Sequence, residues 1–236
     1  MDELTRMWRK VTSQSLKPNT PTEYTWIPAC TDSVIESIFK YNVKIGPVDL
    51  ITATEAHLPF LISCNSDVEG MRMLGYTYRI SPERFKDDMY SWNVLQIIVT
   101  ESPIGFVKAN VNPDDKNANV SLYLVPKARG WGISHLVMRP FLSLLFDTLS
   151  LHKVQFAVWE FNKSSLNNFK QYLNLDAILR EDAYYQGRYW DKFVFSVVDR
   201  EWTTVKNQLV IMEERANKLL TKRKERRRAI SETVLG

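Results

Sequence analysis

Two glycines stand one residue apart in the segment "PKARGWGISHLV", although the chain has only eight glycines in 236 residues. Glycine is used where the backbone takes a positive φ or where another group approaches it closely. A glycine turn that leads into a helix leaves backbone N–H groups pointing outward at the positive end of the helix dipole. The pattern at Gly130 and Gly132 therefore predicts a site for a diphosphate, with Lys127 and Arg129 adding positive charge. A plain strand-to-helix turn is the alternative interpretation.

The flanking segments predict the elements that would position this turn. Three runs rich in β-branched residues, at 94–100, 104–111 and 119–125, predict consecutive antiparallel strands. The segment 133–149 is apolar nearly all round and predicts a buried helix with a kink at Pro140. Periodicity and turn residues predict the remaining elements, which are strands at 48–54, 154–161 and 188–198 and helices at 55–65, 81–92 and 162–173.

Both ends of the chain differ from this central part. Residues 1–45 lack a steady period and suggest a loose arm with a short helix at 31–41. From Trp202 a long helix is predicted to reach about Arg228. Its apolar residues recur at spacings of three and four, and they could pack on the parent domain or on a second copy of the chain: Trp202, Val205, Leu209, Met212, Ala216 and Leu219.

Charge is distributed unevenly along the chain. The net charge is +4, yet the stretch 215–228 holds eight basic residues against Glu225 alone, a local balance of +7 that leaves −3 for the rest. An acidic body with a basic C-terminal helix is unlike a uniformly basic nucleic-acid binder. The basic end suggests a nucleic acid or an acidic protein as partner, and a solvated helix end is the simpler alternative.

The remaining composition excludes several classes of protein. Cys30 and Cys64 fit neither a disulfide framework nor a zinc site, and the three histidines are scattered, so no metal site is expected. The N-terminus lacks the apolar core of a signal peptide, and Arg139 and Pro140 interrupt the longest apolar stretch. We therefore expect a protein that is soluble, cytoplasmic and without a membrane partner.

Three segments in the same order resemble one family. "KARGWG" resembles the Gln/Arg-x-x-Gly-x-Gly/Ala signature of the GNAT superfamily of acyl-CoA N-acyltransferases, with Lys127 in the first position. "NKSSLNNF" is similar to the family's Asn-x-x-Ser/Ala segment. "GRYWDKFVFSVVDREW" resembles the ending of the RimJ/RimL branch, which acetylates ribosomal proteins. The resemblance covers about residues 47–202.

The resemblance implies an α/β fold of the α+β type, with a mixed, mostly antiparallel central sheet flanked by helices. It divides the chain into an N-terminal arm at 1–45, an acyltransferase domain at 46–202 and a C-terminal amphipathic helix with a basic end at 203–236. It also implies acetyl-CoA as co-substrate and an amine as acceptor: a protein N-terminus, a small molecule or an amino group on a nucleic acid.

The resemblance further implies a role for particular residues. The co-substrate's diphosphate would lie on the loop amides, its pantetheine would pair with the backbone of Val125, and a main-chain N–H of Leu122 or Tyr123 would polarise the thioester. Asn162 and Ser165 match positions that line the pantetheine arm. The residues of the diphosphate loop are Lys127, Arg129, Gly130, Trp131, Gly132 and Ile133.

The sequence departs from the family pattern at the expected catalytic positions. Phe169 stands where many members have a tyrosine that protonates the leaving thiolate, and Tyr172, three residues on, is the best local substitute, with packing in the core as its alternative role. By register, Asn119 occupies the place of a common glutamate, and an amide is no base. Asp191 matches a frequent branch residue, for which a structural role and a catalytic role are both open.

Two functions remain open at this stage. The first is an N-acetyltransferase that transfers an acetyl group from acetyl-CoA to an amine. The second is a non-catalytic protein of the same fold, which uses its terminal arms to assemble with a larger particle or with other copies. The missing tyrosine and glutamate favour the second function. The pair of glycines favours the first, on the premise that a turn kept only for folding has no need of Gly132.

Overall fold

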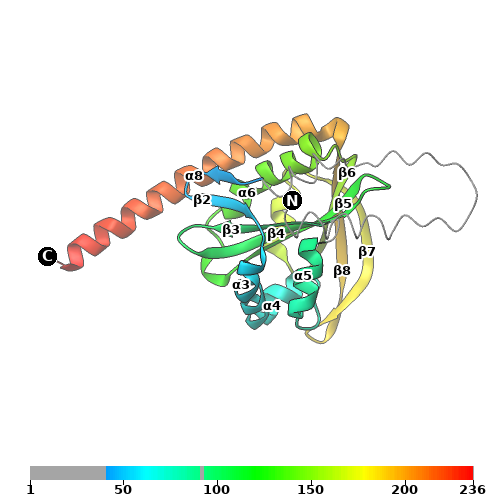
Figure 1. The fold of residues 1–236 in the computed structure, drawn as a ribbon, viewed down its shortest axis with the longest axis horizontal. Helices are drawn as coiled ribbons and strands as arrows, with labels where there is room; N and C mark the ends of the chain where they lie inside the picture. The colour runs from blue at the N-terminus through cyan, green and yellow to red at the C-terminus, as the bar shows by residue number, and fades with distance from the viewer. Residues whose placement is uncertain (1–40, 91–92, 236) are drawn as a thin grey trace, which may run out of the picture.

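The computed structural model describes residues 41–90 and 93–235, which form one eight-stranded sheet with helices on both faces (Figure 1). The strand order is β1-β2-β3-β4-β5-β6-β8-β7, and every neighbouring pair is antiparallel except β5 and β6. The strands are β1 (Val43–Ile45), β2 (Val48–Thr52), β3 (Asn93–Val99), β4 (Pro103–Asn112), β5 (Asn117–Leu124), β6 (Lys153–Trp159), β7 (Asn174–Tyr185) and β8 (Arg188–Val198). The predicted mixed, mostly antiparallel sheet is confirmed.

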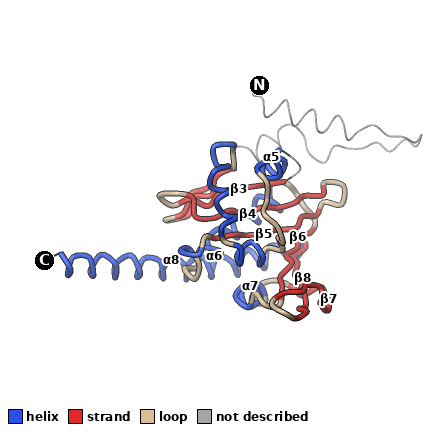
Figure 2. Tube along the Cα trace, turned by 90° about the horizontal axis from the view of Figure 1, so that it is seen from below, coloured by secondary structure: helices blue, strands red, loops and turns tan. Residues whose placement is uncertain are grey.

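The helices divide between the two faces of the sheet, and α7 follows β6 beside the β7–β8 hairpin (Figure 2). Local sequence sets where several of them begin. The Asp67 carboxylate accepts from the Gly70 N–H at the start of α4, and the Asn162 side chain accepts from the Ser165 N–H at the start of α7. The helices are α3 (Leu58–Ser63), α4 (Val68–Met73), α5 (Pro82–Tyr90), α6 (Ile133–Ser143), α7 (Lys163–Phe169) and α8 (Asp199–Leu235).

Each face of the sheet has its own apolar core. One core lies under α3, α4 and α5, where Leu61 and Phe85 pack on Ile97 and Phe106 of the sheet. The larger core lies under α6, α7 and α8, and its fully buried side chains include Leu136, Phe141 and Leu145. The helix predicted at 133–149 is α6 followed by a π-helical turn, Leu144–Thr148, with Pro140 inside α6.

Helix α8 packs along α6 and then continues beyond the sheet (Figure 1). The stripe predicted in the sequence faces the core as far as Ala216, but Leu220 is the buried residue of the next turn and Leu219 is 56% exposed. Arg139 on α6 forms a bidentate ion pair with Glu213, with N–O distances of 2.5 and 3.1 Å. The part of α8 up to Leu220 therefore belongs to the same body as the sheet.

Three elements were absent from the sequence predictions: β1, α4 and the long strand β7. The short helix predicted at 31–41 lies almost wholly outside the described residues. Strand β7 is an edge strand with mostly exposed side chains, so it lacks the alternation that marks a half-buried strand. The signal that could have found it is the turn at Gln186 and Gly187, which both have positive φ and join β7 to β8.

Candidate active site

Strands β5 and β6 start side by side and then separate. Their parallel pairing covers only three residues, ending at the pair of Asn119 with Gln155. Strand β5 continues to Leu124 and β6 continues to Trp159, with no pairing between them beyond that point. The two strands therefore leave a gap between their carboxyl ends, and backbone groups on both sides of it are without a strand partner.

The hydrogen-bond pattern identifies which backbone groups point into this gap. The Val125 N–H donates to the Ile104 carbonyl at 2.9 Å. In an antiparallel pair, the residues that bond across alternate with residues whose N–H and C=O point the other way. The backbone groups of Leu122 and Leu124 therefore face the gap, whereas those of Tyr123 face β4. Of the two main-chain donors predicted for the thioester, Leu122 is the one whose N–H faces the gap.

The same reasoning applies to β6. The Glu160 N–H donates to the Asp191 carbonyl at 2.9 Å, so Glu160 and Asp191 form a bonded pair with β8. Ala157 and Trp159, which lie three residues and one residue before Glu160, then turn their backbone groups toward β5. The gap is thus lined by main-chain groups from two strands, which suits an extended ligand that carries amide groups. The carbonyls of Leu124 and Trp159 are already used, since they accept from Arg129 Nε and from the Asn162 N–H at 2.9 Å each.

The glycine turn lies at the open end of the gap, between β5 and α6. Gly130 has φ +71°, and a Cβ atom there would meet nothing within 4 Å. Gly132 has φ +75° and is the N-cap of α6, but a Cβ there would lie 3.0 Å from the Cβ of Ala216 on α8. The premise that a turn kept only for folding has no need of Gly132 is wrong, because its φ and the contact with α8 both require glycine. Gly130 is the glycine with open space in front of it.

Arg129 is tied to the protein rather than directed at a ligand. Its Nε donates to the Leu124 carbonyl at 2.9 Å, and its guanidinium forms an ion pair with Asp67 and lies 5.6 Å from the Tyr123 ring. Burial alone would raise the pKa of Asp67, but hydrogen bonds from Gly70, Tyr123 and Arg129 lower it. This network ties the glycine turn to the start of α4.

Two further residues in this network have perturbed pKa values. Burial and the nearby Asp67 raise the pKa of the Cys64 thiol to about 12, so this buried free cysteine stays a neutral thiol. Burial also raises the pKa of Tyr123, whose hydroxyl donates to Asp67 at 3.0 Å. The sequence reasoning missed Asp67, for which the only signal is its position as the N-cap of a short helix.

The other predicted cofactor residues lie around the gap. Both backbone groups of Val125 have partners within the chain, since its carbonyl also accepts from the Ala128 N–H at 2.9 Å. Lys127 is exposed in the turn before Gly130, whereas Trp131 is half-buried and packs against the larger core. Ile133 is buried in the first turn of α6. These positions place the turn beside the gap, and the roles of its residues toward a ligand stay predictions.

Asn162 and Asp191 both have structural partners. The Asn162 side-chain oxygen accepts from the Ser165 N–H at 3.2 Å, as expected for a helix N-cap. Asp191 Oδ1 accepts from the Glu181 N–H at 2.9 Å, where β7 has a register shift. Asp191 therefore holds the irregular part of the hairpin together, which accounts for it without a catalytic role.

Tyr172 lies in the core, on the side away from the glycine turn. It follows α7 and packs edge to face on Phe169, with ring centroids 6.1 Å apart. Burial raises the pKa of its hydroxyl, which has no hydrogen-bond partner among the described residues. Strand β7 follows Tyr172, and its first residue, Asn174, pairs with Ser196 of β8. Ser196 also pairs with Gln155 of β6, where β5 and β6 are still paired. This placement argues against the proton-donor role predicted for Tyr172.

A substitution at Tyr172 distinguishes a packing role in the core from a role as proton donor. Tyr172→Phe should leave acetyl transfer unchanged and should keep or raise stability, by up to about 1 kcal/mol, because it removes a buried hydroxyl without a partner. Urea unfolding of both proteins measures the stability, and a thiol-release assay measures turnover. A tenfold loss of turnover at unchanged stability would restore Tyr172 as the acid.

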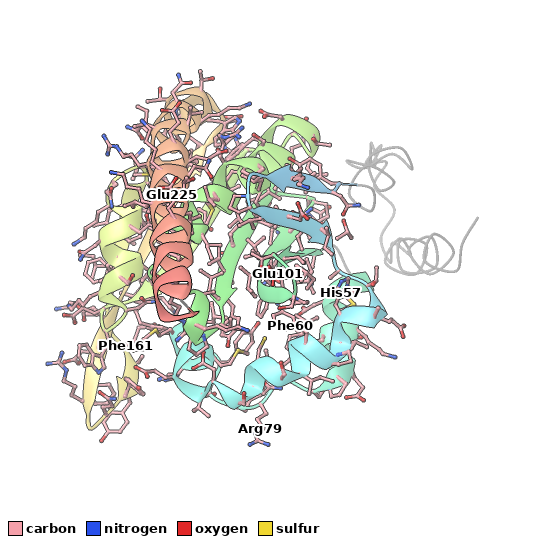
Figure 3. All side chains as sticks on the ribbon, turned by 90° about the vertical axis from the view of Figure 1, so that its left-hand side faces the viewer. His57, Phe60, Arg79, Glu101, Phe161 and Glu225 are labelled. Atoms are coloured by element: carbon pink, nitrogen blue, oxygen red, sulfur yellow. The ribbon has the colours of Figure 1, made fainter. Side chains whose placement is uncertain are left out.

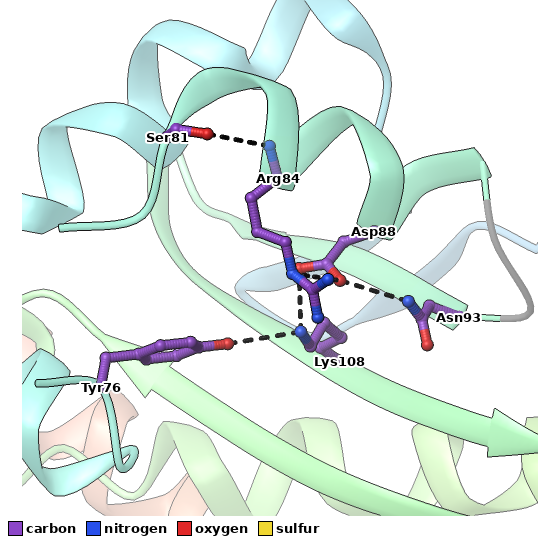
Figure 4. A network of polar contacts seen from close by, with 6 residues as sticks. All are labelled: Tyr76, Ser81, Arg84, Asp88, Asn93 and Lys108. Atoms are coloured by element: carbon purple, nitrogen blue, oxygen red, sulfur yellow. Dashed lines mark hydrogen bonds and ion pairs between the residues drawn. The ribbon is translucent and has the colours of Figure 1, made fainter. Parts of the chain in front are cut away.

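A buried ion pair lies on the face of the sheet that α5 covers (Figure 4). Lys108 on β4 donates to Asp88 on α5 at 2.8 Å, and both side chains are at most 4% exposed. The Tyr76 hydroxyl lies 3.3 Å from the Lys108 ammonium, and Asn93 donates to the second oxygen of Asp88. Nothing in the spacing of these residues predicted the pair, because the partners come from separate elements.

Comparison with solved structures identifies the fold. A protein described as an acetyltransferase, from T. thermophilus, superimposes with a TM-score of 0.60 at 21% sequence identity. The superposition covers 73% of this chain and 97% of the T. thermophilus chain. The spermidine N-acetyltransferase from Vibrio cholerae, in complex with CoA and spermine, gives a TM-score of 0.61 at 17% sequence identity. That superposition covers 66% of this chain and 98% of the Vibrio cholerae chain. No protein-family model matches the chain, and no curated protein matches it.

The chain therefore has the fold of these acetyltransferases, as the GNAT resemblance implied. Identities of about one in five establish a shared fold and not a shared substrate. The assignment to the RimJ/RimL branch stays a prediction.

No helix within residues 41–90 and 93–235 is long and apolar enough to span a membrane. Within the same residues, no three His, Cys, Asp or Glu side chains come together as metal ligands.

Proposed function

We propose that the protein is a cytoplasmic N-acetyltransferase that transfers an acetyl group from acetyl-CoA to an amine. The observation that carries this proposal is the gap between β5 and β6, with a glycine turn at its open end. The gap offers main-chain partners for the amide groups of pantetheine. The turn offers Gly130 and the start of α6 for the diphosphate, because a helix N-terminus favours negative charge.

The chemistry needs few side chains. The acceptor nitrogen attacks the thioester carbonyl carbon, the carbon–sulfur bond breaks, and the departing thiolate takes up the proton that the amine loses. The Leu122 N–H faces the gap and would polarise the carbonyl oxygen, which stabilises the charge that develops there. Asn162 and Ser165, at the start of α7, would flank the pantetheine arm. Neither Tyr172 nor Asp191 is needed in this scheme.

A thiol-release assay tests the activity. The protein is incubated with acetyl-CoA and a panel of amines that includes peptides with free N-termini, spermidine and small primary amines. We expect release of CoA thiol above the background with at least one amine, together with a product heavier by one acetyl group in mass spectrometry. Acetyl-CoA binding without transfer to any amine would favour the non-catalytic function of the same fold.

The C-terminal part of α8 is proposed to contact nucleic acid. Leu220 is buried against the body, Thr221, Lys222 and Glu225 are exposed, and the helix continues to Leu235 through a strongly basic sequence. This part of the sequence is dominated by its basic residues, so its charge is the property that a partner would recognise: Lys222, Arg223, Lys224, Arg226, Arg227 and Arg228. A polyanion such as RNA or DNA is the partner that this charge fits best.

Deletion of residues 221–236 tests this contact. The truncated protein should keep its fold and its acetyl-CoA binding, because the buried residues Ala216 and Leu220 remain. Its affinity for RNA and duplex DNA should fall at least about tenfold, and the affinity of the full-length chain should weaken steeply with salt. Fluorescence anisotropy measures both. Equal binding by the two proteins, or no binding at low salt, would leave α8 as a solvated helix end or a protein-docking segment.

A further inference from the structure

Four aromatic side chains gather where β6 meets the tip of the β7–β8 hairpin. Phe161 lies 4.7 Å from Tyr185, 5.6 Å from Trp190 and 6.3 Å from Trp159, measured between ring centroids. Phe161 is labelled in Figure 3, where it lies beside this hairpin. Trp159 is the last residue of β6, and its backbone faces the gap between β5 and β6. Trp159 and Phe161 therefore lie at the end of β6 that borders the gap, and the Trp159 ring lies near Gly75, on the side of the sheet that α4 covers.

Three cations lie on these rings, and we call the whole set the aromatic–cationic cluster. The Arg188 guanidinium lies 3.3 Å from the centroid of Trp190, and the Lys192 ammonium lies 4.4 Å from that of Trp159. Arg72, which comes from α4, lies 5.6 Å from Tyr185 and donates to the Tyr184 carbonyl at 3.0 Å. Arg72 thus links α4 to the tip of the hairpin.

Four carboxylates around the gap are paired with cations, whereas Asp191, next to Trp190, accepts from the Glu181 N–H rather than from a cation. Asp182 binds Lys192 at 2.6 Å, and Glu160 binds Lys163 at 3.1 Å. On the α4 and α5 side, Asp67 pairs with Arg129 and Asp88 pairs with Lys108. By contrast, within residues 41–90 and 93–235 neither Arg72 nor Arg188 forms an ion pair with a carboxylate. The aromatic–cationic cluster therefore contains two guanidiniums that form no ion pair with a described carboxylate.

We infer that the acceptor is an amine that also carries an anionic group, a carboxylate or a phosphate, next to an aromatic or other planar group. This inference rests on the proposed function, since it names the class of acceptor for that site. Arg72 and Arg188 would bind the anionic group, because a guanidinium donates two parallel hydrogen bonds to such a group. A polyamine would meet repulsion from the same cations, which already lie on three rings that could hold its ammonium groups, those of Trp159, Tyr185 and Trp190.

Tyramine, tyrosine, tyramine phosphate and spermidine provide the test. The first three share a ring and a primary amine and differ in the anionic group, so they distinguish carboxylate from phosphate. Calorimetry measures the affinity of each amine with and without saturating CoA. We expect tyrosine or tyramine phosphate to bind at least about tenfold more tightly than tyramine, and spermidine to bind most weakly. Arg72→Gln and Arg188→Gln should each remove this preference, whereas Arg200→Gln, at the start of α8, should keep it.

The outcomes separate this inference from the proposed function. If CoA does not bind, the proposed function fails, while the preference of the cluster for anionic amines is still measured without CoA. If CoA binds but spermidine binds as tightly as the anionic amines, the class of acceptor is wrong and the proposed function stands. Absence of binding by both anionic amines, or an unchanged preference in both arginine variants, also overturns the inference.

Discussion

Gly130→Asp is expected to abolish acetyl-CoA binding while the fold is retained. A side chain at this position would enter open space in front of the glycine turn, where the diphosphate is proposed to lie. Aspartate tolerates the left-handed backbone better than most residues, so the cost to stability should be only about 1 kcal/mol. The carboxylate adds a like charge at close range, and we expect affinity to fall at least about a hundredfold. Calorimetry with acetyl-CoA measures the loss.

Gly187→Asp is the matched control for this variant. Gly187 has φ +83° and open space around a Cβ atom, as Gly130 does, but it lies in the β7–β8 turn. The control should share the small loss of stability and keep acetyl-CoA binding. Gly132 is unsuitable for this test, because a side chain there would push against α8. Equal affinity of the Gly130 and Gly187 variants would place the diphosphate elsewhere.

Asp88→Ala should give the largest loss of stability, about 3 kcal/mol or more. It leaves the Lys108 ammonium buried and without a carboxylate, and an uncompensated buried charge is costly. Replacing both residues, as Asp88→Leu with Lys108→Met, should recover most of the loss because no buried charge then remains. Chemical denaturation measures the free energy of unfolding of each variant.

Lys86→Ala is the control for the ion pair. Lys86 pairs with Glu55 at 3.4 Å, but both side chains are about half exposed, so its loss should cost less than about 1 kcal/mol. A loss of similar size in Asp88→Ala would mean that the buried pair is more solvated than its burial indicates. Failure of the double variant to recover stability would mean that Asp88 acts mainly through Asn93 and Arg84.

The sequence predicts the central part of the fold because its signals are local. The β-branched runs that became β3, β4 and β5 and the apolar segment of α6 are each long enough to decide their own structure. Strand β7 was missed because it is an edge strand whose exposed side chains follow no period. The apolar stripe predicted on α8 is buried as far as Ala216. In the next turn Leu220 is buried instead of Leu219, because burial there depends on how α8 lies on α6.

The site was predictable only in its backbone. A glycine turn between a strand and a helix can be read from the sequence, and the structure places that turn beside the gap. Side-chain roles were less accessible. Arg129 was expected to attract phosphate, but Asp67 holds it, and that contact joins residues 62 positions apart. Tyr172 shares a helical spacing with Phe169, yet the chain leaves α7 after Phe169 and turns Tyr172 into the core.

Titration of the unmodified chain with acetyl-CoA in a calorimeter tests the central claim most directly. The gap and the glycine turn predict one site per chain, with a Kd between about one micromolar and one millimolar, the range in which the KM values of enzymes usually fall. CoA should compete for the same site, because the diphosphate and pantetheine are common to both molecules. Absence of heat and of any thermal shift at millimolar acetyl-CoA would contradict the claim, although the fold would stand.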